Sequence, residues 1–205
     1  MATTMATTTA VPRARQGAPD ADPVLDAALA AFLDFGIRRT SMGEIARRAG
    51  ISPATLYRRY AAKSDVVMAV GLREAQRDLA AIDARIDTSA PPVEQLTRLY
   101  LEVSRRLHGN RLLRRVLETE PETVLPRLTL EAGPLLDIGR GYLADVLVRL
   151  QREGHLPAYD VTPVVDWLAR HALSETLTPP PSPPTDEAVA DFVRRHLAPF
   201  VGLTA

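Results

Sequence analysis

The chain has 205 residues, of which 46% are hydrophobic and 24% are charged, a composition typical of a globular protein. It contains no cysteine, which excludes disulfide bonds and thiolate chemistry. No apolar run approaches the roughly 20 residues that span a bilayer, and the N-terminal Met-Ala-Thr-Thr repeat lacks the apolar core of a secretory signal. We therefore expect a cytoplasmic protein without a membrane partner.

The formal net charge is zero, but the charges are unevenly distributed. Residues 1–63 hold nine Lys and Arg against five Asp and Glu, whereas the rest of the chain holds 16 basic and 20 acidic side chains. Within residues 37–63 there are seven basic side chains and one acidic side chain. This asymmetry indicates a local phosphate-binding surface on an otherwise acidic protein.

Residues 1–22 are rich in Thr, Ala, Pro and Arg without periodicity, so we expect a disordered N-terminal arm. Arg13 and Arg15 belong either to a plain solvated tail, the favoured interpretation, or to an arm that reaches a nucleic-acid backbone or minor groove. From Pro23 to Phe35 the apolar residues fall at helical spacing, and Gly36 follows as a helix end.

The segment at residues 40–63 predicts two short helices joined by a turn. Ser41 and Glu44 form the Ser-x-x-Glu pattern of a capping box. Gly50 provides a position where φ can be positive, which ends the first helix. Ser52 can cap the second helix, and Pro53 suits its first turn.

Leu56 is expected to face back onto the first of these helices, leaving Thr55, Arg58 and Arg59 to face outward. Together with the helix at 23–35, this pattern predicts a three-helix domain built around a helix-turn-helix. The second helix of such a motif is shaped to enter a DNA major groove.

The same region resembles the N-terminal signature of TetR-type transcriptional regulators, over roughly residues 24–70. The matching positions are Gly36, Thr40, Ser41, Ile45, Ala46, Ala49, Gly50, Ile51, Ser52, Thr55, Leu56, Tyr57 and Lys63. Arg58 and Arg59 depart from the pattern, because the family often has aromatic or His residues there. The resemblance implies a DNA-reading domain followed by helices that bind an effector and form a dimer.

Lys63 is expected to begin a long helix that runs to about Arg85. Its buried stripe comprises Val66, Val67, Val70, Leu79 and Ile82. Gly71 lies inside this helix and leaves two interpretations open. Close packing against a neighbour is favoured over a bend that helps to transmit motion.

After a break at residues 87–92, helices are predicted at about 92–108, 111–120, 133–153, 161–177 and 185–201. A Pro-punctuated stretch at 121–131 and a stiff extended loop at 178–184 separate some of them. No alternating strand pattern is present, so the predicted fold is all-α. The predicted division is an arm at 1–22, a DNA-binding domain at 23–70 and a helical ligand-binding and dimerisation domain at 71–205, with the long helix crossing between the last two.

DNA contacts are predicted around the starts of the two motif helices and along the second one. The candidates are Thr40, Ser41, Gly43, Ser52, Pro53, Ala54, Thr55, Tyr57, Arg58, Arg59 and Lys63. Ala54 and Thr55 suit a thymine methyl group, whereas the later residues suit phosphates, with a guanine as the alternative for Arg58 or Arg59. For Tyr57 and Lys63 the phosphate role is implied by the resemblance. Arg47 and Arg48 are interpreted as a solvated face.

One such domain buries too little surface for a specific site, so we expect a homodimer on a palindromic double-stranded DNA operator. The resemblance implies that the last two helices form the dimer as a four-helix bundle. Candidate interface residues are Leu168, Ala172, Val189, Phe192, Val193, His196, Leu197 and Phe200.

The resemblance also implies that the middle helices bind a small effector, which we expect to be mainly apolar with one or two polar anchors. The candidate residues are Tyr100, Val103, Leu107, Leu117, Leu128, Tyr142, Trp167 and His171. Each of them taken singly is more often an ordinary core residue.

The residues offer no catalytic constellation, and we expect neither an enzyme nor a cofactor. His171 and Glu175 stand at i, i+4, but two ligands without a third are more often an ordinary pair than a metal site. The sequence therefore predicts a DNA-binding regulator, more in the manner of a ligand-responsive repressor than an activator. The alternative is a helical ligand-sequestering or adaptor protein with a vestigial DNA-binding domain.

Overall fold

The computed structural model describes residues 22–180, 182 and 184–203. The predicted arm, with Arg13 and Arg15, and two positions of the 178–184 loop lie outside the described residues. The described elements are helices: α1 Pro23–Phe35, α2 Met42–Arg48, α3 Pro53–Arg59, α4 Lys63–Asp83, α5 Pro92–Gly109, α6 Arg111–Thr119, α7 Pro121–Leu128, α8 Gly133–Arg152, α9 Thr162–Leu177, α10 Asp186–Phe192, a π-helical turn η1 Val193–Leu197 and α11 Ala198–Phe200. The prediction of an all-α fold is confirmed.

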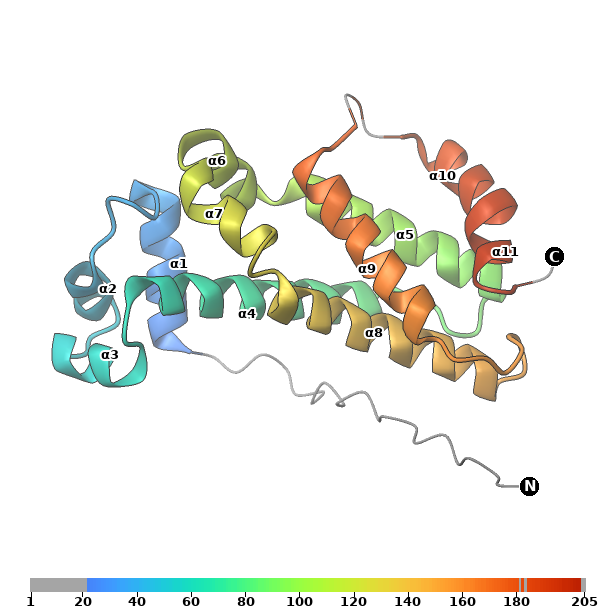
Figure 1. Ribbon diagram of the computed structural model, residues 1–205, viewed down its shortest axis with the longest axis horizontal. Helices are drawn as coiled ribbons and strands as arrows, with labels where there is room; N and C mark the ends of the chain where they lie inside the picture. The colour runs from blue at the N-terminus through green and yellow to red at the C-terminus, as the bar shows by residue number, and fades with distance from the viewer. Residues whose placement is uncertain (1–21, 181, 183, 204–205) are drawn as a thin grey trace, which may run out of the picture.

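Helix α4 connects the two ends of the molecule (Figure 1). Its first half packs with α1–α3 in one core, to which it contributes Val66 and Val70. Its last turns reach a second core formed with α5, α8, α9 and the C-terminal helix, where Ile82 is buried. The predicted stripe on this helix is therefore shared between two cores, and α4 is a rigid element common to both.

The first helix shows how local signals set an element's bounds. The Asp22 carboxylate accepts hydrogen bonds from the amides of Val24 and Leu25, which caps the helix, and Pro23 occupies the first turn. Gly36 ends the helix with φ of 83°, a value that favours glycine. The bounds of α1 agree with those predicted from the sequence.

No helix was predicted in the Pro-punctuated stretch at 121–131, but its residues Pro121–Leu128 form α7. Pro121 lies in the first turn, where its missing N–H breaks no helical bond. Pro126 lies two residues before the helix ends and removes only one internal bond. Val124 packs against the N-terminal core and Leu128 is buried, so packing outweighs the local cost of the second proline.

The C-terminal helix is continuous from α10 through the π-helical turn to α11. Pro199 has no N–H to donate to the carbonyl of Arg195, and the wider turn lies directly before it. Val189, Val193 and Leu197 are buried in the chain's own core. Three of the predicted dimer residues therefore serve the monomer core, and the outward-facing residues of this helix remain for a partner.

Gly71 lies on the exposed side of α4, and a Cβ built there would have no atom within 4 Å. The favoured interpretation, close packing against a neighbour, is therefore wrong. The space around the residue permits a larger side chain, and the helical backbone there does not require glycine.

We predict that Gly71→Ala stabilises the protein by about 0.5–1 kcal/mol, because alanine loses less backbone entropy in a helix interior. Urea denaturation followed by circular dichroism would measure the shift. Gly36→Ala is the opposed control, since φ is positive there and the new Cβ would collide with the Glu120 carboxylate. A destabilised Gly71→Ala variant would contradict the prediction.

Candidate nucleic-acid interface

The two motif helices are each started by a serine. Ser41 Oγ accepts the amide of Glu44 at 3.1 Å, and Ser52 Oγ accepts the amide of Thr55 at 3.1 Å. Ser52 Oγ also lies 2.9 Å from Thr55 Oγ1. The Glu44 carboxylate does not return to Ser41 but binds two arginines, so only half of the predicted capping box is formed.

The start of α3 is presented to solvent above a fully buried anchor. Ser52, Pro53 and Ala54 are exposed, Thr55 is half-buried, and Leu56 is completely inaccessible in the core. Tyr57 and Arg58 are exposed on the following turn, and Ser41 and Gly43 are exposed at the start of α2. Apart from the buried Leu56, these positions were all predicted to contact DNA, and they lie accessible at the capped starts of α2 and α3 and on the following turn of α3.

Thr40 and Lys63 hold the connection between α1 and α2. Thr40 is buried, and its hydroxyl lies 2.7 Å from the carbonyl oxygen of Gly36. The Lys63 ammonium donates to the carbonyls of Ile37, Arg38 and Thr40 at 2.8, 3.1 and 3.0 Å. In this arrangement both polar groups serve the protein itself, and their predicted phosphate contacts remain predictions.

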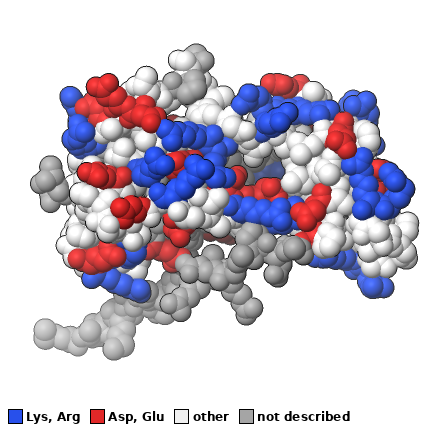
Figure 2. All heavy atoms as spheres, turned by 180° about the vertical axis from the view of Figure 1, so that it is seen from behind, with Lys and Arg blue, Asp and Glu red and all other residues white. Residues whose placement is uncertain are grey.

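The basic residues of the motif are largely compensated by neighbours. Arg47 and Arg48 both bind Glu44, and Arg48 also binds Asp34 at 2.7 Å. Within the described part of the chain, the exposed Arg58 makes no ion pair, whereas Arg59 does. Across the face in Figure 2, basic and acidic side chains are interspersed. The sequence count of seven positive charges therefore overstates the charge available to a phosphate backbone.

Glu44 has a strongly lowered pKa, about 2, because its side chain accepts hydrogen bonds from Arg47 and then Arg48. The carboxylate is therefore ionised throughout the neutral range and permanently offsets one of the two guanidinium charges.

We predict that the Glu44 carboxyl titrates near 2 rather than near 4.5 in a pH series followed by NMR. The contribution of this group to stability is present above its unfolded pKa and is lost as pH falls toward the folded value. Arg47→Ala should move the midpoint upward, whereas Arg58→Ala should leave it unchanged. A wild-type midpoint near 4.5 would show that the arginine pairing does not form in solution.

Helices α6 and α7 contact the helix-turn-helix domain, and this contact was not predicted from the sequence. The buried Glu120, between these helices, accepts the amide of Arg38 at 2.6 Å. Glu122 lies 3.5 Å from the Arg38 guanidinium, and Val116 is buried in the N-terminal core. These contacts join residues more than 80 positions apart, so no local pattern could have identified them.

Several residues predicted for the effector and the dimer lie together on an exposed aromatic face, which we define as Trp167, His171, Phe192, His196 and Phe200. The Trp167 ring stacks on His171 at 5.3 Å and meets Phe200 at 4.9 Å. Trp167, Phe192 and Phe200 are 51%, 39% and 48% exposed. Trp167 and His171, predicted to line a pocket, therefore share a surface with the outward residues of the C-terminal helix.

The other predicted effector residues are distributed over the helical interior. Tyr100 donates a hydrogen bond to Glu175 at 3.0 Å, and burial raises its pKa to about 12. The Tyr142 hydroxyl is buried without a hydrogen-bond partner among the described residues. Leu128 is buried, and the remaining candidates, Val103, Leu107 and Leu117, are half-buried.

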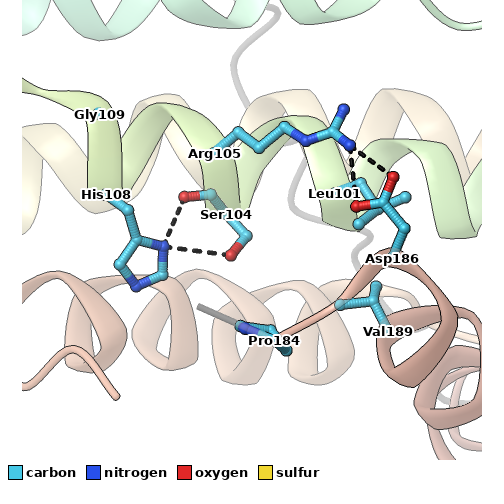
Figure 3. A pocket seen from close by; sticks show the side chains of 8 residues that line it. All are labelled: Leu101, Ser104, Arg105, His108, Gly109, Pro184, Asp186 and Val189. Carbon is cyan, nitrogen blue, oxygen red and sulfur yellow. Dashed lines mark hydrogen bonds and ion pairs between the residues drawn. The ribbon is translucent and has the colours of Figure 1, made fainter. Parts of the chain in front are cut away.

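A cavity of about 260 Å³ lies between α5 and the start of α10 (Figure 3). Arg105 faces Asp186 across one side of it, with 2.7 Å between Nη2 and Oδ2, and His108 turns toward Ser104 on the other. None of the predicted effector residues lines it. Its volume is just below the roughly 300 Å³ that begins the usual range for ligand pockets.

The described residues contain no cluster of three or more side chains suited to a metal ion. His171 and Glu175 are an ordinary pair with 3.4 Å between Nε2 and Oε1. No helix in this part of the chain is long and apolar enough to cross a membrane.

Comparison with known proteins agrees with this geometry. Residues 24–70 match the sequence profile of bacterial regulatory proteins of the tetR family. Uncharacterised HTH-type transcriptional regulators of Mycobacterium bovis and Mycobacterium tuberculosis are each 28% identical over 137 residues, covering 67% of this chain and 69% of theirs.

The fold is shared with solved repressors. The TetR family repressor AlkX from Dietzia, implicated in the biodegradation of n-alkanes, superposes with a TM-score of 0.72 at 23% identity, over 89% of this chain and 97% of its own. The TetR-family repressor QsdR of R. erythropolis has a TM-score of 0.65 at 20% identity, over 89% and 94% of the two chains.

Proposed function

We propose that this chain, a TetR-family transcriptional regulator, is a repressor that binds a palindromic operator as a homodimer and responds to a small molecule. The observation that carries the proposal is the exposed edge at the start of α3, held by the Ser52 cap and the buried Leu56. Rigid presentation of this edge suits base contacts in a major groove. In this proposal residues 23–70 read DNA and residues 71–205 bind the effector and the second copy.

We place the second copy on the aromatic face. Large exposed aromatic side chains are enriched at the centres of protein interfaces, where their burial contributes much of the affinity. Trp167 and Phe200 lie on the two helices at the C-terminal end of the fold, away from α3 (Figure 1). A symmetric pairing of this face leaves both α3 helices free to meet half-sites about 34–36 Å apart.

Response to an effector requires a physical connection between the two cores, and the structure contains two such connections. Helix α4 belongs to both, and the Glu120 carboxylate binds the connection between α1 and α2. An effector that favours one arrangement of α5–α8 would change the orientation of α1–α3 through these contacts. A changed separation of the two α3 helices would prevent both half-sites from being held at once.

We place the effector among the interior helices, with Tyr142 as one polar anchor. Burial and, after it, the nearby Asp83 carboxylate raise the pKa of its hydroxyl, which makes no hydrogen bond within the described part of the chain. A ligand's polar group would satisfy it. The surrounding cluster is apolar and includes Leu96, Leu99 and Leu147. A mainly apolar molecule with one polar group is the chemistry that this environment suits.

We predict that Arg58→Ala weakens operator binding and reduces the slope of log K against log salt by about 0.9, the value for one phosphate contact on B-DNA. The measurement is a gel-shift or anisotropy titration with DNA flanking the protein's own gene. Arg152→Ala, at an exposed arginine of α8, is the matched control and should leave the slope unchanged.

The same assay separates the proposed function from a sequestering or adaptor role. A repressor gives a discrete dimeric complex, whereas a vestigial DNA-binding domain gives none. Specific binding that persisted in a variant combining Tyr57→Ala, Arg58→Ala and Arg59→Ala would contradict the assignment of α3 to DNA reading.

We predict that Trp167→Arg raises the dimer dissociation constant about 30-fold or more, equivalent to about 2 kcal/mol for loss of an interface hot spot. Sedimentation equilibrium would measure it. Leu130→Arg is the control, because Leu130 is also a large exposed apolar residue, at 92%, but lies between α7 and α8. Equal effects of the two variants, or none for Trp167→Arg, would place the interface elsewhere.

A further inference from the structure

We propose that Asp22 is a specificity-determining residue for DNA: its carboxylate pairs with the Arg59 guanidinium in the place that a DNA phosphate would otherwise take. The inference rests on the proposed function and concerns how strongly the protein binds DNA irrespective of sequence. It begins from the two adjacent arginines at the end of α3, which have different surroundings.

Arg59 and Asp22 form a two-point ion pair between the end of α3 and the start of α1. Arg59 Nη1 lies 3.2 Å from Asp22 Oδ1, and Nη2 lies 2.5 Å from Oδ2. The same fork of two parallel N–H donors is what arginine offers to a phosphate. The carboxylate thus satisfies the guanidinium in the way that a phosphate does.

Asp22 is fixed in this position by its other contacts. Its Oδ1 also accepts the amides of Val24 and Leu25, so three donors converge on Oδ1 and one on Oδ2. The buried Arg73 donates to the Asp22 carbonyl at 3.3 Å. The Asp22 side chain is 10% exposed, whereas that of Arg59 is 52% exposed. The cation can therefore be reached by DNA, while the carboxylate is held in place.

The consequence is a reduced net charge on the last turn of α3, where Arg58 and Arg59 lie. Arg58 makes no ion pair with the described residues and keeps its full charge. The Asp22 carboxylate neutralises the charge of Arg59 and uses the paired donors of its two Nη atoms, so the two arginines together provide one uncompensated positive charge instead of two. Sequence-independent affinity depends on the number of phosphates neutralised, and lowering it raises the ratio of specific to non-specific binding.

The test is the Asp22→Asn variant, which removes the charge but keeps a side chain that caps helices as well as aspartate does. Binding of a labelled duplex of unrelated sequence would be followed by fluorescence anisotropy over a salt series. We expect the slope of log K against log salt to steepen by about 0.9, and affinity at 0.1 M salt to rise about eightfold, as one additional released counterion requires. Circular dichroism and urea denaturation would verify that the variant is folded.

Two further variants isolate the interaction. Asp26→Asn removes the same charge from α1, but Asp26 pairs with Arg73 and Arg77 of α4, so the slope should not change. Adding Arg59→Ala to Asp22→Asn should abolish the gain.

An unchanged slope or lower affinity in folded Asp22→Asn would overturn the inference alone, as would a gain that survives Arg59→Ala. A folded wild-type protein that binds no duplex at any salt concentration would overturn the proposed function together with it.

Discussion

The arrangement of the two domains depends on the six-residue connection between α1 and α2, residues 36–41. The Lys63 ammonium at the start of α4 binds three of its carbonyls, and the Glu120 carboxylate between α6 and α7 binds one of its amides. A cation and an anion from separate helices thus hold the same short backbone segment. Glu120 is buried and Lys63 is partly buried, and charges withdrawn from water are costly unless they are paired or hydrogen-bonded. The connection, α4 and the α6–α7 corner therefore stabilise one another.

Through these contacts, a displacement of the helices at one end of the molecule can be transmitted to the helices at the other end. Interiors packed at crystal-like density respond to displacement by shifting whole elements. The α6–α7 corner also buries Val116 in the N-terminal core, so movement of α6 cannot leave α1 and α2 undisturbed. In the proposed function, an effector therefore needs no direct contact with α2 and α3.

The local part of this architecture could be predicted from the sequence, because its causes are local. Ser52, Pro53, Gly50 and Gly36 act within one turn of their own positions, and the helix bounds that they set agree with the structure. The burial of Leu56 followed from helical spacing. The two ends of the motif and its exposed edge could therefore be predicted without knowledge of the rest of the fold.

The remainder could not be predicted, because its causes lie between segments that are distant in the sequence. Glu120 is 82 positions from Arg38 and Asp22 is 37 from Arg59, and neither pair has a recognisable spacing. The prolines at 121–131 gave no signal for a helix, but packing by Val124 stabilises α7 there. Counting charges along the chain likewise gave a more basic surface than the paired side chains leave.

The π-helical turn before Pro199 has a consequence for the shape of the aromatic face. Phe192, His196 and Phe200 recur every four residues, and on a regular helix of 3.6 residues per turn such a row rotates by about 40° at each step. The wider π turn advances fewer degrees per residue, which counteracts this rotation between Phe192 and Phe200. The row thereby runs more nearly parallel to the helix axis, and Phe200 reaches Trp167. Pro199, through the π-helical turn before it, thus helps to align the three aromatic rings of this helix in a straight row along the aromatic face.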